Sequence, residues 1–140
     1  MKPLKKYMPL FLLTVFVLFS PARVLAQDTM ILVASQASLV KTQPWIDFLK
    51  KNEISVEHAV PSEFKSVKNK KYITIVGGMD EAGIKDMITE VIGPAEASTL
   101  AQAGAKKTFM RENIWVAGQR VLIFAGDNAE SAAAAPADGA

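Results

Sequence analysis

The stretch YITIVGGMD, residues 72–80, decides the fold of this chain. Its β-branched and aromatic residues are typical of a buried strand, and a helical pattern follows it. Gly77 and Gly78 permit a positive φ and a close approach of two backbones at the turn. Asp80 can accept hydrogen bonds from the free N–H groups of the first helical turn. The stretch therefore predicts a strand that feeds a helix through a tight turn.

The clearest helical period in the chain comes directly after this strand. Apolar residues recur at three- and four-residue spacing from Ile84 to Ile92, which predicts an amphipathic helix. Gly93 ends this helix, and Pro94 suits the start of a second short helix that Gly104 closes. We expect these elements to form the unit against which the rest of the chain packs.

Four other segments have the composition of strands. Residues 30–34 are apolar throughout, and residues 120–125 are apolar after Arg120, which is typical of buried strands of a parallel sheet. Residues 54–60 and 107–111 alternate between polar and apolar, which favours strands with one buried face at the edges of a sheet. The five strands together predict a mainly parallel sheet.

Two further helices complete the predicted element order. Thr42 and Pro44 suit the cap and first turn of a helix that ends near residue 52. A last helix is expected to begin after Asp127, which can form a capping box with Glu130, and to end at Pro136. Strands that alternate with helices predict an α/β fold, a small three-layer sandwich with a mainly parallel sheet and flavodoxin- or Rossmann-like topology.

The first 26 residues have the features of a secretory signal peptide. Lysines at positions 2, 5 and 6 precede an apolar run over residues 8–19, and VLA at residues 24–26 supplies the small residues of a cleavage site. Because the apolar run is shorter than the roughly 20 residues of a membrane span, cleavage after Ala26 is favoured over retention as an anchor. We expect a secreted or periplasmic protein with one α/β domain, residues 27–135, and a flexible tail, residues 136–140.

Removal of the signal peptide changes the sign of the net charge. The chain has 16 basic and 14 acidic residues, and the first 26 residues hold four of the basic ones and none of the acidic ones. Residues 27–140 therefore carry 12 basic and 14 acidic residues, a formal net charge of −2, which argues against a nucleic-acid partner. The sequence contains no cysteine, which excludes disulfides, thiol catalysis and thiolate metal sites.

Three loops are expected to meet at the carboxyl edge of the sheet, where open α/β sheets bind ligands. They are residues 35–38, 77–80 and 126–128, and each joins small residues to the start of a helix. Free N–H groups at helix starts favour anions, although ordinary sharp turns need the same residue types. The candidate ligand-binding residues are Ser35, Gly77, Gly78, Asp80, Gly126, Asp127 and Asn128.

Patterns that indicate catalysis or metal binding are weak in this sequence. His58 is the single histidine, and a hydrolase would need it close to Ser35 or Ser38 and to an acidic residue. The sequence has no G-x-S-x-G, G-x-G-x-x-G or Walker motif, and its acidic residues are scattered. We therefore expect neither an enzyme nor a bound metal or cofactor.

Two segments resemble the cell-wall-binding repeat family of secreted bacterial proteins, and they are similar to related modules of archaeal surface-layer proteins. The segments are ITIVGG, residues 73–78, and VLIFAGDNAESAA, residues 121–133. They match an I-x-G-G strand end, a later G-x-D/N strand end, and a helix with a Ser or Thr and alanines. The Arg-Tyr pair that follows the Asp in the family is replaced here by Asn128-Ala129-Glu130. The resemblance implies a non-catalytic envelope module.

These observations give one functional expectation and two alternatives. The expected function is an exported, non-catalytic binding or structural module, whose partner is a cell-envelope polymer or an envelope protein. No nucleic acid, and no membrane span after signal cleavage, is expected. The first alternative is a periplasmic protein that binds a small ligand or an anion through the same loops. The second is a hydrolase that uses Ser35 and His58.

Overall fold

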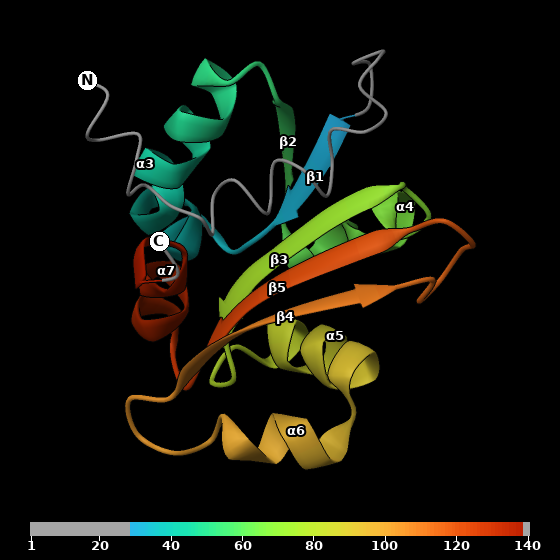
Figure 1. The fold of residues 1–140 in the computed structure, drawn as a ribbon. Helices are drawn as coiled ribbons and strands as arrows, with labels where there is room; N and C mark the ends of the chain where they lie inside the picture. Colours follow the sequence, from blue (N-terminus) through green and yellow to red (C-terminus); the bar gives the residue numbers. More distant parts are fainter. Residues whose placement is uncertain (1–28, 139–140) are drawn as a thin grey trace.

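A five-stranded sheet forms the centre of the computed structural model, which describes residues 29–138 (Figure 1). The strand order is β2-β1-β3-β5-β4, and all strands are parallel except β4, which runs antiparallel to β5. The strands are β1 (Thr29–Val33), β2 (Ser55–Ala59), β3 (Tyr72–Gly78), β4 (Lys106–Glu112) and β5 (Arg120–Gly126). The expected signal peptide, residues 1–26, lies outside the described residues, as do residues 139–140.

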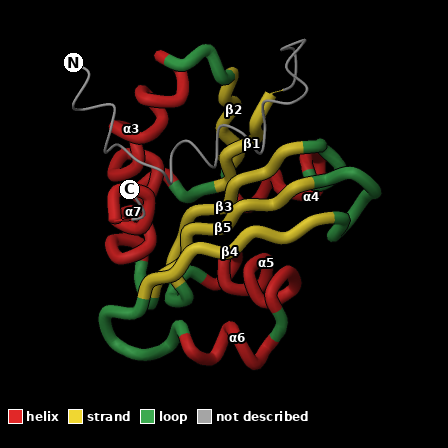
Figure 2. Tube along the Cα trace, in the orientation of Figure 1, coloured by secondary structure: helices red, strands yellow, loops and turns green. Residues whose placement is uncertain are grey.

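Helices lie on both faces of this sheet (Figure 2). One face is covered by α3 (Gln36–Lys51) and α7 (Ala129–Asp138), and the other by α4 (Phe64–Val67), α5 (Ala82–Ile92) and α6 (Pro94–Thr99). A short 3-10 turn, η2 (Pro61–Glu63), precedes α4. Two separate clusters of buried side chains fill the two interfaces between helices and sheet. The predicted α/β class with a mainly parallel sheet is confirmed, and so are the predicted edge positions of β2 and β4.

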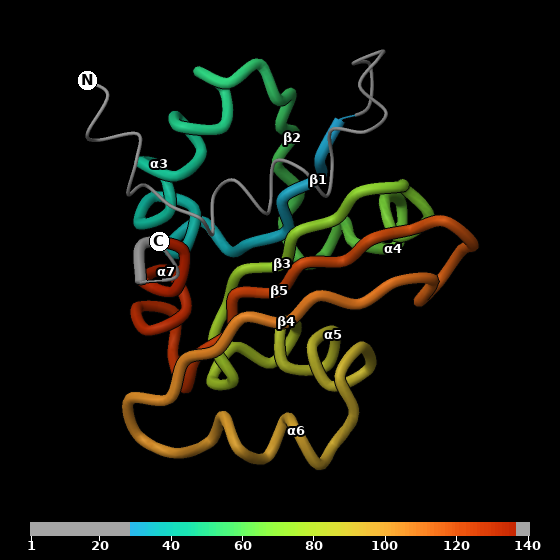
Figure 3. Tube along the Cα trace, in the orientation of Figure 1, coloured from blue at the N-terminus to red at the C-terminus, as the bar shows by residue number. Residues whose placement is uncertain are grey.

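The strand β3 lies at the centre of the sheet, between β1 and β5, which come from opposite ends of the described chain (Figure 3). All seven of its residues are buried. Ile73 and Ile75 face the α5 side, while Tyr72 and Val76 face α3 and α7. Thr74 also faces α3 and α7, and its hydroxyl donates a hydrogen bond to Met30 Sδ at 3.0 Å. The β3 side chains therefore contribute to both cores, in agreement with the buried strand that its β-branched and aromatic residues predicted.

Three glycines at the carboxyl edge allow helices to pack directly on strand ends. A Cβ atom on Gly78 would lie 2.2 Å from the backbone of Asn128. A Cβ atom on Gly126 would lie 2.6 Å from Ala132 N, and one on Gly77 would lie 2.4 Å from a side chain of α5. The predicted close approach is confirmed. The predicted positive φ at Gly77 and Gly78 is wrong, because neither glycine is among those with a positive φ.

The helix α3 begins earlier than the sequence pattern indicated. Ser35 Oγ caps it by accepting a hydrogen bond from Ser38 N at 3.2 Å. Thr42, the predicted cap, is buried within the helix and donates its hydroxyl to Ser38 O at 2.6 Å. Pro44 lies inside the helix and leaves the Val40 carbonyl without a helical donor. Because Val40 is 71 % exposed, that side of the helix faces water, where the loss of one hydrogen bond costs little.

Two other predicted helix ends are also wrong. Asp80 does not cap α5, because the N-cap position belongs to Glu81, whose carboxylate accepts a hydrogen bond from Gly78 N at 3.0 Å. The helix α7 does not end at Pro136 and continues to Asp138. Ala132 and Ala135, which precede Pro136, are packed in the core, and Pro136 itself is buried within the helix.

The side-chain amide of one buried glutamine joins two loops at the amino edge of the sheet, opposite the carboxyl edge. Gln119 lies in the loop between β4 and β5, where its Nε2 donates to the carbonyls of Lys68 and Lys70 at 2.8 and 2.7 Å. Its Oε1 accepts a hydrogen bond from Trp115 N at 3.0 Å. The Trp115 ring packs edge-on against Phe64, with ring centroids 5.1 Å apart. The loop is thus joined to the turn before β3 by a buried side chain whose donors and acceptor are satisfied.

We expect Gln119→Ala to destabilise the protein by about 1–3 kcal/mol, because it leaves part-buried backbone groups of Lys68, Lys70 and Trp115 without partners. Urea unfolding measures the change, and Gln102→Ala at an exposed position is the control. Equal unfolding midpoints for the two variants would contradict the role assigned to Gln119.

Gly78→Ala is expected to cost about 3 kcal/mol or to prevent folding, because its methyl group would overlap the Asn128 backbone. Gly83→Ala on α5 is the matched control. A Cβ atom at Gly83 would lie 3.3 Å from Pro61 Cβ, and alanine favours the helix, so we expect a change within about 1 kcal/mol. A Gly78→Ala variant as stable as the parent would show that close packing does not require this glycine.

Candidate functional site

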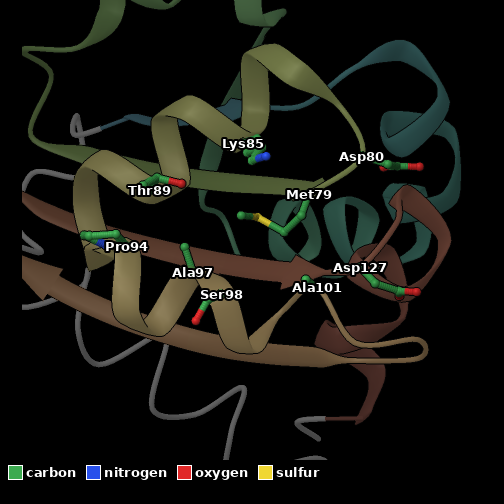
Figure 4. A pocket seen from close by; sticks show the side chains of 9 residues that line it. All are labelled: Met79, Asp80, Lys85, Thr89, Pro94, Ala97, Ser98, Ala101 and Asp127. Atoms are coloured by element: carbon green, nitrogen blue, oxygen red, sulfur yellow. The ribbon is translucent and has the colours of Figure 1, made fainter.

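A groove opens at the carboxyl edge of the sheet, between the β3–α5 turn, the helices α5 and α6, and the end of β5 (Figure 4). Its volume is about 440 Å³, within the range of roughly 300–1,000 Å³ that is typical of ligand sites. The residues that line it are Met79, Asp80, Lys85, Thr89, Pro94, Ala97, Ser98, Ala101 and Asp127.

The register of the sheet places two of the lining segments next to each other. Gly78 pairs with Gly126, so β3 and β5 end at the same level. Met79 N then donates to Gly126 O at 2.9 Å, one residue beyond the paired strands. The other wall is formed by α6, which contacts α5 after the chain turns at Gly93, a glycine with φ of 92°. The groove is therefore built by two strand ends and one sharp helix–helix connection.

Asp127 attaches the α6–β4 loop to the end of β5. Its Oδ2 accepts a hydrogen bond from Gly104 N at 3.0 Å, and its own N–H donates to Ala105 O at 3.0 Å. The hydrogen bond from Gly104 is the main cause that lowers the pKa of Asp127 below 3.8. The carboxylate therefore stays ionised at neutral pH and holds one wall of the groove in place.

Two carboxylates and one ammonium group line the groove. In Figure 4, Asp80 and Asp127 lie at one end, Thr89 and Pro94 lie at the other, and Lys85 lies between. Within residues 29–138, Asp80, Asp127 and Lys85 form no ion pair. The groove thus offers the exposed charges of Asp80 and Lys85 to a ligand, whereas Asp127 Oδ2 is held by Gly104 N and its Oδ1 is buried.

The structure brings the seven predicted residues to one edge of the sheet, but only Asp80 and Asp127 line the groove. Asn128 Oδ1 accepts a hydrogen bond from Ser131 N at 2.8 Å and so caps α7. The predicted capping box between Asp127 and Glu130 is wrong, because Asp127 is directed to Gly104 instead. The other predicted residues have packing or capping roles: Ser35, Gly77, Gly78 and Gly126.

The sequence did not predict most of the residues that line the groove, including Lys85 and all of the α6 wall. The helical period of α5 identified its buried face, whereas Lys85 and Thr89 lie on the remaining surface of the helix. The Gly93-Pro94 break is the sequence feature that could have predicted the α6 wall, because it indicates two helices that meet at an angle.

The helix starts at this edge are poorly suited to bind an anion. The first turns of α3 and α7 are capped by Ser35 and Asn128. No side chain caps the first turn of α5, but the carboxylates of Asp80 and Glu81 lie beside it in the chain. Negative charge at this position opposes the approach of an anion.

The structure does not join the residues of the hydrolase alternative by hydrogen bonds. His58 is exposed on β2, and its Nε2 lies 2.9 Å from Ala34 O, to which it donates. Ser35 Oγ accepts from the backbone of α3, and Thr42 donates to the Ser38 carbonyl. Over the described part of the chain, no group of three or more His, Cys, Asp or Glu side chains could hold a metal ion.

No family model, no curated protein and no solved structure matches this chain. The resemblance to cell-wall-binding repeats therefore stays a prediction from the sequence. Among the helices of residues 29–138, none is long and apolar enough to cross a membrane. The function has to be argued from the groove itself.

Asp127→Asn is expected to lower the urea midpoint of unfolding at pH 7. Because the folded-state pKa is lowered, the ionised carboxylate stabilises the folded state above the unfolded-state value of 3.8. This contribution is lost as the pH falls through the folded-state pKa, so the difference between variant and parent should then disappear. Asp86→Asn, which removes an exposed carboxylate of α5, is the control. A difference that is constant from pH 7 into the acid range would contradict the assignment.

Proposed function

We propose that the protein is an exported, non-catalytic binding module of the cell envelope, which holds its partner in the carboxyl-edge groove. The groove is the observation that carries this proposal. It has the size of a ligand site, it lies where α/β sheets bind ligands, and it contains unpaired charges. The partner is an envelope polymer or an envelope protein with a projecting group small enough to enter the groove.

The sequence supports export and an envelope location. The basic start, the apolar run and the VLA site of residues 1–26 are the pattern of a cleaved signal peptide. The resemblance of residues 73–78 and 121–133 to cell-wall-binding repeats points to the same compartment. A domain without cysteine is stable there through its two apolar cores.

The topology supports the position of the site. We infer that the sheet is a variant of the flavodoxin-like arrangement, whose strand order is 2-1-3-4-5. The order here begins in the same way, and then β5 takes the place beside β3 while β4 forms an antiparallel edge. The groove lies beyond the carboxyl ends of β3 and β5, the end of the sheet that such folds use for ligands.

A second candidate function is a periplasmic small-ligand-binding protein that uses the same groove. The groove volume of about 440 Å³ favours it, since this space suits a small molecule. The anion version of this candidate has less support, because Asp80, Asp127 and Glu81 place negative charge near the start of α5, which has no side-chain cap.

Filling the groove tests the proposal. Ala101 is exposed and lines the groove, so Ala101→Phe should block it without disturbing either core. Ala103→Phe places the same ring at an exposed position of the same loop outside the groove and is the matched control. We expect the parent and Ala103→Phe to bind isolated envelope polymer in a sedimentation assay, and Ala101→Phe to lose at least about tenfold in affinity.

Circular dichroism of both phenylalanine variants controls for folding. Equal binding by Ala101→Phe and Ala103→Phe would show that the groove is not the contact surface. Lack of binding by the parent protein would contradict the envelope-polymer partner.

A further inference from the structure

The charges in the groove are arranged to suit a ligand that itself carries two opposite charges. Asp80 and Asp127 lie at one end of the groove and Lys85 lies farther along it (Figure 4). Both Asp80 and Lys85 are exposed, and within residues 29–138 neither has an ion-pair partner. A purely anionic ligand would meet the two carboxylates, and a purely cationic one would meet Lys85.

The surface between these charges is built from small and apolar side chains. Ala97 and Ala101 come from α6 and the loop after it, and Met79 comes from the β3–α5 turn. Thr89 adds a hydroxyl group on α5. This surface leaves room for small substituents on the ligand, such as methyl groups, and gives them apolar contacts.

We infer that the groove binds a short zwitterionic peptide with small side chains through both of its charged groups. The peptide ammonium group pairs with Asp80, with the carboxylate of Asp127 adding negative charge at that end, and the peptide carboxylate pairs with Lys85. The inference rests on the proposed function, because it names the ligand class of the same groove. A peptide carried by an envelope polymer would present both charges where it has a free amino group as well as its terminal carboxylate.

The restraint on Asp127 supports this arrangement. Its Oδ2 is held by Gly104 N, and the lowered pKa keeps the group ionised. A negative charge that is fixed by backbone hydrogen bonds loses little side-chain entropy when a cation approaches. Lys85 is more mobile in principle, since four methylene groups carry its charge, and we expect it to contribute less to affinity than the carboxylate end.

Four forms of alanyl-alanine separate the two charge contacts. The free dipeptide has both charges, the N-acetylated form lacks the ammonium, the C-terminal amide lacks the carboxylate, and the doubly blocked form lacks both. Each form is titrated into the purified protein as its L,L and its D,D isomer, so that chirality cannot hide an interaction. Isothermal titration and the shift of the unfolding temperature measure binding.

We expect at least one isomer of the free dipeptide to bind. N-acetylation should weaken binding by about fivefold and amidation by about twofold, both within the range of one solvent-exposed ion pair. Asp80→Asn should bind the free and N-acetylated forms equally. Lys85→Gln should bind the free and amidated forms equally. This crossed pattern assigns each ligand charge to one side chain.

Two exposed residues outside the groove provide matched controls. Asp86→Asn removes a carboxylate from α5, and Lys65→Gln removes an ammonium group from α4. Both variants should retain the parent's preference for the free dipeptide. A loss of preference in either control would show that net charge, rather than the groove, determines binding.

The outcomes distinguish this inference from the proposed function. If no isomer binds, or if all four forms bind equally, the zwitterionic ligand is wrong. The proposed function then still stands when Ala101→Phe abolishes capture of envelope polymer. If Ala101→Phe leaves both dipeptide binding and polymer capture unchanged, the groove is not the site and both proposals fail.

Discussion

The fold depends on the direct contact between the start of α7 and the carboxyl ends of β3 and β5. Gly78 and Gly126 pair across these strands, and neither position has room for a Cβ atom. Because the helix start is this close, Asn128 caps α7 while Asp127 is directed the other way, to Gly104. That hydrogen bond fixes the α6–β4 loop, which forms part of the groove wall. The packing of three backbone segments thus determines the shape of the proposed site.

The same contact explains which ligands the carboxyl edge can accept. The helix starts of α3 and α7 are occupied by Ser35 and Asn128, and so the anion-binding property of helix N-termini is largely used by the protein itself. The accessible charges instead belong to side chains of the groove. A ligand recognised by these side chains must match charges of both signs over a small apolar surface. This requirement favours a projecting peptide or small zwitterion over a phosphate or sulfate group.

The sequence predicted the parts of the fold that depend on burial. The β-branched and aromatic residues of positions 72–76 identified the central strand, and alternation identified the edge strands β2 and β4. The groove was predicted only in part, because the α5 residues that line it, Lys85 and Thr89, lie outside the apolar stripe that the hydrophobic period identifies. Two helix starts were predicted at the wrong residue. Ser35 caps α3 in place of Thr42, and Asn128 caps α7 in place of Asp127. Which of two neighbouring polar residues caps a helix depends on tertiary hydrogen bonds, such as that from Gly104, which local sequence does not reveal.

The carboxyl-edge groove is the proposed binding surface of this protein. Amide chemical shifts of the isotope-labelled protein, recorded while soluble envelope fragments are added, test it most directly because every backbone N–H reports on its own surroundings. If ligands bind in the groove, the largest shifts map to residues 79–85, 97–104 and 127. Shifts that map instead to the lysine-rich turn at residues 65–71 and to Trp115, on the opposite edge of the sheet, would contradict it.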